Sequence, residues 1–225
     1  MTRDPAGLAP PRIVELAALG AFVTLAAHAV PLWLFGEVWP ALGDTRRRVI
    51  DLIGRPSAYH LVCLGVALLL ALPTARRSGL VIGRVRGLGW KLIGICAVPV
   101  VLTAIVYTRL PVRPFAGAPV SMWLISPAAQ ELFFLGYLYG RFAERFDRPL
   151  FPRVPVNGAL VMTAAFFASW HLVNFFTMPP GYVAFQLCYT FAMTLWTGMT
   201  RVMTGSLIWA IAVHMAVNAV AWATP

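Results

Sequence analysis

Long apolar stretches recur along the whole chain, and they constrain its fold more than any other feature. About 20 mostly apolar residues are needed for a helix to cross the hydrocarbon core of a bilayer, and a helix satisfies its backbone hydrogen bonds internally. We therefore expect an all-α polytopic membrane protein, a single membrane domain over residues 1–225 built as a bundle of seven transmembrane helices. The seven expected spans are residues 13–38, 57–73, 90–107, 119–141, 157–176, 182–199 and 206–223. The glycine-rich stretch 79–89 is typical of an interfacial or re-entrant element, which leaves an eighth helix open.

The composition excludes a soluble domain and argues against a nucleic-acid partner. Hydrophobic residues make up 60% of the chain and charged residues only 12%, whereas a soluble domain is about half apolar and a quarter charged. The formal net charge is +10, but the basic residues stand in short loops between the apolar stretches. That distribution is typical of cytoplasmic loops and of contact with anionic lipids of the bilayer. It lacks the basic and aromatic surface of a nucleic-acid binder, so we expect no nucleic-acid partner.

The distribution of lysine and arginine predicts the orientation in the membrane. With the N-terminus inside, twelve of these residues fall on the inner side and six on the outer side. Loops rich in lysine and arginine stay in the cytoplasm, which favours a multi-pass protein of the bacterial cytoplasmic (inner) membrane with its N-terminus inside. The cluster Arg46–Arg48, which would lie outside, opposes this orientation.

Polar residues interrupt the C-terminal apolar stretches at four places, which are Glu131, His171, His214 and Asn218. Ionisable groups in hydrocarbon are energetically costly and usually face a bundle interior or a wet cavity, so they are candidates for function. Taken singly, each is more often part of an interhelical hydrogen bond than a catalytic group. Together they suffice for hydrolysis, because a carboxylate aided by one histidine can take a proton from water. The second histidine and the asparagine can then stabilise an oxyanion.

Other hydrolase chemistries fit the sequence less well. A zinc protease of the H-E-x-x-H type is disfavoured, because neither His171 nor His214 stands in that motif. A serine hydrolase is disfavoured, because Ser169 and Ser206 lack a G-x-S-x-G setting. A metal site built from Glu131, His171 and His214 is geometrically conceivable. We nevertheless predict neither a metal ion nor another cofactor.

Three short motifs follow one another in this half of the chain. They are Gln130-Glu131-x-x-x-Leu135, Phe167-x-x-x-His171 and His214-x-x-x-Asn218. They resemble the E-E-x-x-x-R, F-x-x-x-H and H-x-x-x-N signatures of the CPBP intramembrane proteases, the glutamic endopeptidases of the CAAX prenyl protease and bacteriocin-processing (Abi) type. The resemblance covers residues 119–223. It implies a metal-independent intramembrane endopeptidase that cleaves a membrane-embedded protein or peptide near its C-terminal or hydrophobic segment.

The resemblance also divides the candidate residues into two groups. The catalytic ones are Glu131, His171, His214 and Asn218. The binding ones are Gln130 and Phe167. The carboxylate would be the base with the first histidine assisting, and the second histidine and the asparagine would form the oxyanion site.

The first motif departs from the family at two positions. Gln130 stands where the family has its first glutamate, and Leu135 stands where the family has arginine. Since an amide cannot accept a proton at neutral pH, the water-activating role would move to Glu131. Pro127 would supply the helix distortion that turns this carboxylate towards His171. The alternative is a catalytically inactive relative with an immunity or scaffold role, whereas a small transporter is disfavoured because the chain shows no inverted repeat.

Overall fold

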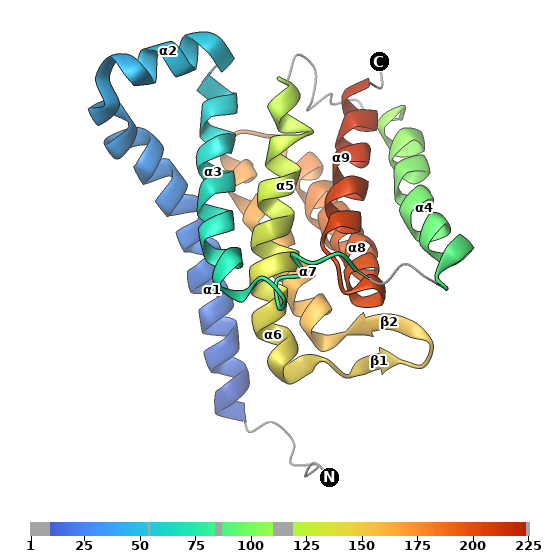
Figure 1. Ribbon diagram of the computed structural model, residues 1–225. Coiled ribbons are helices and arrows are strands. Elements are labelled where there is room, and N and C mark those ends of the chain that lie inside the picture. The colour runs from blue at the N-terminus through green and yellow to red at the C-terminus, as the bar shows by residue number, and fades with distance from the viewer. Residues whose placement is uncertain (1–9, 54, 84–86, 110–118, 224–225) are drawn as a thin grey trace.

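In the computed structural model, almost every element is a helix, and consecutive long helices alternate in direction through an up-and-down bundle (Figure 1). The structure describes residues 10–53, 55–83, 87–109 and 119–223. The long helices are α1 (Pro10–Trp33), α3 (Arg55–Ala71), α4 (Gly89–Tyr107), α5 (Ile125–Glu131), α7 (Gly158–Trp170), α8 (Pro180–Thr204) and α9 (Ile208–Ala223). Each of the seven apolar stretches therefore contains a helix.

Among the described residues, three helical stretches are long and apolar enough to cross a membrane. They are Arg55–Thr74, Gly89–Tyr107 and Gly158–Phe176, whereas α9 is a shorter apolar helix. The first stretch consists of α3 followed by the 3₁₀ turn η3 (Leu72–Thr74). The third consists of α7 followed by the 3₁₀ helix η6 (His171–Phe176). The helical, membrane-type architecture is thus confirmed, while the number of seven spans stays a prediction.

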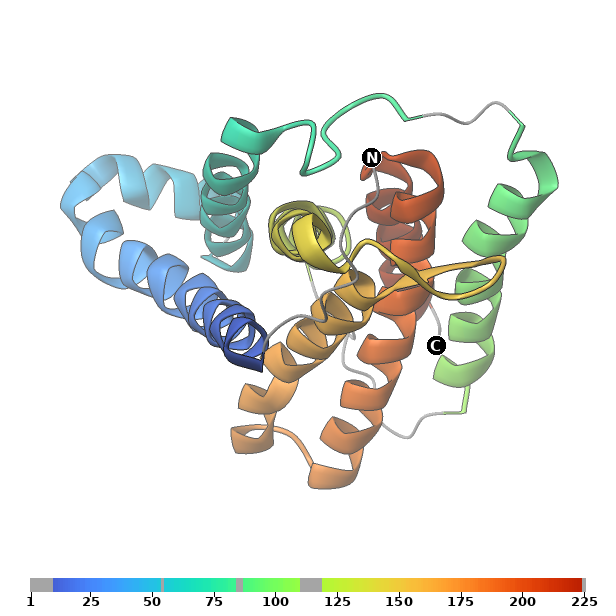
Figure 2. The ribbon, with the colours of Figure 1, turned by 90° about the horizontal axis from the view of Figure 1, so that it is seen from below.

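The central helix is a composite of three segments. α5 ends at Glu131, the π-helix η5 (Leu132–Leu138) follows directly, and α6 (Tyr139–Phe146) completes the segment. Figures 1 and 2 show this composite in the middle of the bundle. We expected Pro127 to distort the helix, but the irregular segment begins five residues later. π-Helical turns are rare and occur frequently at functional sites.

The core of the bundle is built around η5. Phe134, Leu135 and Leu138 are fully buried, and the Phe134 ring stacks on Phe167 of α7 with 4.4 Å between the ring centroids. Gly198 allows α8 to come close to this cluster, because a Cβ atom there would lie 3.2 Å from a Leu135 methyl group. Lipid tails are as apolar as these side chains, so close packing rather than the hydrophobic effect holds such helices together.

An asparagine fixes the start of α7. The Asn157 side chain caps the helix by accepting a hydrogen bond from the backbone N–H of Leu160 at 2.9 Å. Its amide also donates to the Tyr139 hydroxyl at 3.1 Å, and the residue is buried. The cap satisfies one of the free N–H groups of the helix and ties α6 to α7.

Several elements were not expected from the sequence. The amphipathic helix α2 (Gly43–Ile53) contains Arg46–Arg48, and it follows the π-helical turn η1 (Leu34–Val38) and the 3₁₀ turn η2 (Trp39–Leu42). A further 3₁₀ turn, η4 (Val120–Met122), precedes α5, and a short antiparallel hairpin joins β1 (Pro149–Phe151) to β2 (Val154–Asn157). These elements are too short or too polar to show in a search for apolar spans. In Figure 1 the hairpin and α2 lie at opposite ends of the bundle.

The segment after α3 is a loop in its described part. It crosses α6 in Figure 1 and reaches the corner between α8 and α9, where the Leu207 N–H donates to the Gly79 carbonyl at 2.9 Å. Residues 79–83 and 87–88 form no helix, and residues 84–86 lie outside the described ranges. The extra helix that we allowed for at 79–89 is therefore not seen in these residues.

Candidate active site

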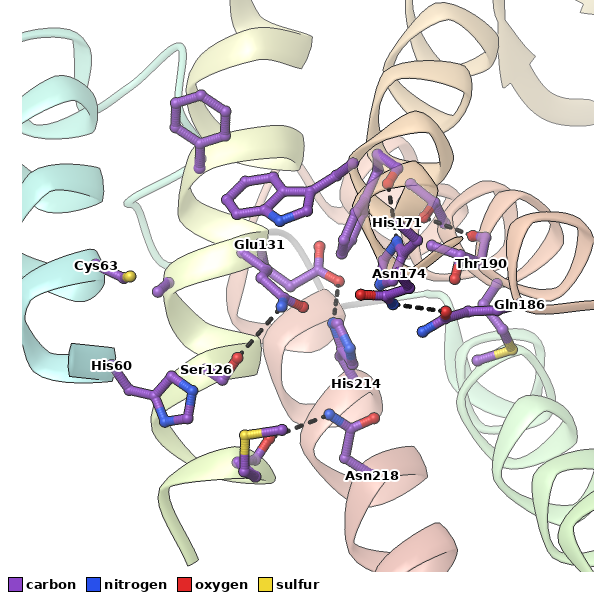
Figure 3. A pocket seen from close by; sticks show the side chains of 18 of the residues that line it. His60, Cys63, Ser126, Glu131, His171, Asn174, Gln186, Thr190, His214 and Asn218 are labelled. Atoms are coloured by element: carbon purple, nitrogen blue, oxygen red, sulfur yellow. Dashed lines mark hydrogen bonds and ion pairs between the residues drawn. The ribbon is translucent and has the colours of Figure 1, made fainter. Parts of the chain in front are cut away.

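One cavity brings all the predicted site residues together. Its volume is about 470 Å³, and it lies among α3, α5, α7, α8 and α9 (Figure 3). The predicted residues that line it are Gln130, Glu131, Phe167, His171, His214 and Asn218. The three motifs, which are spread over residues 130–218 of the sequence, therefore meet at one place. This place is closer to the α2 end of the bundle than to the hairpin end, because α5 starts and α9 finishes there (Figure 1).

The Glu131 carboxylate and the His214 imidazole form the closest polar contact in this group. His214 Nδ1 lies 2.7 Å from Glu131 Oε1, and Glu131 is only 1% exposed. The other carboxylate oxygen, Oε2, is also buried and has no hydrogen-bond partner among the described residues. Buried polar atoms without a partner are rare and call for an explanation. Here one acceptor is held by a histidine and the other is left free beside a cavity.

This pairing differs from the expected one. We expected Glu131 to turn towards His171, but its partner is His214, on the helix that packs directly against α5. Adjacent positions of a helix point about 100° apart, and position 131 points towards α9 (Figure 3). The carboxylate is therefore not left unpaired by the missing arginine of the motif.

His171 stands at the junction of α7 and η6. Its Nδ1 lies 3.2 Å from the Phe167 carbonyl oxygen, one turn earlier. Since a carbonyl can only accept, Nδ1 must carry the hydrogen, which leaves Nε2 of the neutral ring as an acceptor. The same reasoning gives His214 an Nδ1–H directed at the carboxylate. The Phe167 ring lies near both imidazoles, with centroid distances of 5.8 Å to His171 and 5.9 Å to His214.

Two side-chain amides complete the predicted set. Asn218, one turn after His214 in α9, donates to the Met122 carbonyl at 3.4 Å. Gln130 donates to the Ser126 hydroxyl at 3.2 Å, one turn earlier in α5. Both amides line the cavity, and neither forms a hydrogen bond with Glu131 in the described part of the chain. They provide polar groups beside the carboxylate without neutralising it.

Leu135 explains why the family's arginine position is not part of this site. The residue is fully buried in the hydrophobic core around η5. Its side chain faces Gly198 and Leu160 rather than the cavity. The core around it is closely packed, so a charged side chain at this position would have no polar partner.

The sequence did not point to the polar wall opposite the carboxylate. Asn174 of η6 donates to Gln186 Oε1 at 2.8 Å, and the wall continues along one face of α8. Its members on α8 are Tyr182, Gln186, Tyr189, Thr190, Thr194 and Thr197. Apart from the adjacent pair Tyr189 and Thr190, they recur at intervals of three or four residues, which is the spacing of one helix face. That spacing is visible in the sequence and is the signal that would have found them.

Two further histidines line the same cavity without joining the carboxylate. His28 Nε2 lies 3.2 Å from the Trp170 carbonyl oxygen, and His60 Nδ1 lies 3.1 Å from the Ser121 hydroxyl. Each makes a contact between helices, which is the usual role of a single histidine in such a bundle. No group of three His, Cys, Asp or Glu side chains that could hold a metal ion occurs within the described ranges.

Comparison with known families identifies the matching part of the chain. Residues 113–220 match the family described as type II CAAX prenyl endopeptidase Rce1-like. This match confirms the resemblance inferred from the three motifs, and it includes every candidate site residue. No curated protein and no solved structure matches the chain.

Proposed function

Residues 113–220 of this chain match the Rce1-like family of type II CAAX prenyl endopeptidases, and from that premise we propose that the chain is a metal-independent intramembrane endopeptidase with Glu131 as its base. The observation that supports this proposal most directly is the carboxylate beside the cavity. One oxygen of Glu131 is held by His214 at 2.7 Å, and the other is free to accept a hydrogen bond. A base must reach the proton that it removes, and this oxygen is the acceptor within reach.

The reaction that we propose adds water across one peptide bond. Glu131 Oε2 accepts a proton from water, and the hydroxide oxygen attacks the peptide carbonyl carbon. His171 Nε2, an acceptor in the neutral ring, assists by holding the second hydrogen of the water. The proton then passes to the peptide nitrogen as the C–N bond breaks, which yields a carboxylic acid and an amine.

The oxyanion of this reaction needs donors on the other side of the carbonyl. His214 donates from Nδ1 to the carboxylate, so in its protonated form Nε2–H remains for the substrate oxygen. Asn218 offers amide hydrogens from the next turn of the same helix. Preorganised donors of this kind typically contribute about 10²–10³-fold in rate each.

The cavity lining supports a peptide without charged side chains as the substrate. Amides, hydroxyls, aromatic rings and aliphatic groups surround Glu131, and no lysine or arginine is among the described lining residues. A free terminal carboxylate would therefore find no lysine or arginine among these lining residues, whereas an internal peptide group would find donors and acceptors. This favours cleavage some residues before the C-terminus of a membrane-embedded protein or peptide.

The alternative is a catalytically inactive relative, and one observation favours it. Gln130 occupies the family's first glutamate position, and its amide is bonded to Ser126 rather than to a histidine. In that case the cavity would bind a peptide without cutting it, as suits an immunity or scaffold role.

Reconstituted protein distinguishes these two functions. In lipid vesicles, the purified chain is expected to cleave a quenched fluorogenic peptide with a prenylated cysteine three residues before its C-terminus. The rate should be unchanged by EDTA, because the proposed base is a carboxylate and not a metal-bound water. Gln130→Glu serves as the comparison. If the wild type does not cleave the peptide and the Gln130→Glu variant does, the site has lost its catalytic activity through Gln130. That result would overturn the proposal.

We also propose that the N-terminus faces the cytoplasm and that the cavity lies towards the outer side. The hairpin end of the bundle has the larger share of arginines, including Arg76, Arg77 and Arg141, as expected for a cytoplasmic face. Alkaline phosphatase fused after residue 225 should be active, since the enzyme folds only outside the cytoplasm. The same reporter fused to the 75–80 loop should be inactive, and the reverse pattern would invert the topology.

A further inference from the structure

A buried arginine lies at the hairpin end of the bundle, away from the cavity. Arg201 is in the last turn of α8 and is only 7% exposed. Its Nη2 donates to the Arg77 carbonyl at 2.6 Å, and its guanidinium carbon lies 5.6 Å from the centre of the Tyr139 ring. Gly79, with a φ of +73°, passes so close that a Cβ atom there would overlap the guanidinium. The loop after α3 is thus wrapped around this side chain.

No carboxylate compensates the charge of Arg201. Among the described residues it forms no ion pair, and its buried Nε has no hydrogen-bond partner. The carboxylate of Glu144 lines the same region, but its Oε1 already accepts from Arg77 at 2.7 Å and from Arg141 at 3.2 Å. Buried charges are almost always paired, because removing an isolated ion from water is costly. The missing counter-ion is therefore one that the described residues do not supply.

An open groove leads to this arginine. It runs between the loop after α3 and α6, and its charged lining residues are Arg76, Arg77, Arg201 and Glu144. Three cations thus face one anion that is already shared between two arginines. Arg76 and Arg77 are exposed at the mouth of the groove and Arg201 is buried at its wall. This arrangement combines long-range attraction for an anion with a fixed guanidinium, the planar group that binds phosphate through two donors.

We propose that this groove is a phosphate-binding site, in which Arg201, Arg76 and Arg77 hold a phosphate group from a lipid headgroup or from solution. A phosphate oxygen would supply the negative charge that Arg201 lacks. The site is separate from the cavity around Glu131, because the two share no lining residue. Its occupancy can therefore be measured without a protease substrate.

Binding to lipids of defined charge tests the proposal. The full chain, delipidated in a neutral detergent, is titrated with phosphatidylglycerol or with diacylglycerol, which lacks the phosphate, and bound lipid is counted by native mass spectrometry. Phosphatidylglycerol should bind at least about 10-fold more tightly than diacylglycerol, as expected for two or three arginines near an anionic headgroup. A parallel titration with inorganic phosphate, followed by calorimetry, distinguishes a free ion from a headgroup as the source.

Variants of exposed residues keep the test independent of folding. The double variant Arg76→Gln/Arg77→Gln should lose about 10-fold in phosphatidylglycerol affinity. Arg148→Gln, an exposed residue at the same end that does not line the groove, is the matched control and should bind like the wild type. Equal binding of the two lipids without phosphate binding would overturn the proposal. An equal loss in the Arg148→Gln control would also overturn it, because it would show general surface attraction.

Discussion

Replacing Glu131 by glutamine should lower the cleavage rate by about 10²–10⁴-fold, the usual contribution of a general base. An amide cannot take the proton of water, but it keeps the size of the side chain. Its carbonyl oxygen can still accept the hydrogen bond from His214, which Glu131 accepts now at 2.7 Å. The fold should therefore survive while the chemistry is lost. The assay is release of the fluorogenic peptide in vesicles, with the melting temperature measured on the same preparation.

Glu37→Gln is the matched control for this variant. It makes the same chemical change in an exposed residue of η1 that lines neither the cavity nor the groove, so cleavage should continue at the wild-type rate. Undiminished cleavage by Glu131→Gln would exclude Glu131 as the base. A rate loss together with a large drop in melting temperature would show that the Glu131–His214 pair holds the helices together rather than activating water.

Restoring the family's arginine is expected to destabilise this protein. Leu135 is fully buried in the core around η5 and faces α7 and α8, not the cavity. The Leu135→Arg variant would place a charge there without a partner, at a cost of about 3 kcal/mol for the centre of a membrane helix. The monodisperse yield after detergent extraction and the melting temperature should both fall. Leu135→Met, which conserves volume, should cost less than about 1.5 kcal/mol.

The same variant also tests how the first motif should be interpreted. If Leu135→Arg folds normally and cleaves faster, its guanidinium must pair with the Glu131 carboxylate. The packing of η5 described above would then not hold for that variant. We expect the opposite result. The core then explains the departure at this position, because a leucine that packs against Gly198 stands where the motif has its arginine.

The helices and the cluster of candidate residues could be predicted because both depend on local signals. Apolar length alone located a helix in each stretch, and polar residues in apolar surroundings had to face an interior. The pairing of Glu131 with His214 instead of His171 could not be predicted. This pairing depends on which helix packs against α5 and on the direction in which the side chain at position 131 points. The spacing of the motifs in the sequence gives no information on either.

Short or polar elements were missed for a different physical reason. The hairpin of β1 and β2 has strands of three and four residues, and its turn contains Arg153 with a positive φ of 67°. Such strands produce no hydrophobic periodicity. The polar face of α8 does not show in the apolar length of this stretch, because that length does not distinguish one face of a helix from another. A polar residue at every third or fourth position, as in Gln186, Thr190 and Thr194, indicates a helix that lines a cavity.

The bond between Glu131 and His214 has a consequence for biogenesis. The two residues are 83 positions apart, and His214 belongs to α9, which leaves the ribosome after all the other described helices. At typical rates of synthesis, the carboxylate waits roughly 4–17 s for its partner. During that interval the nascent bundle contains a glutamate without its histidine, and the cavity has no wall on the α9 side. The candidate active site is thus assembled last, when α9, the last of the described helices, is inserted.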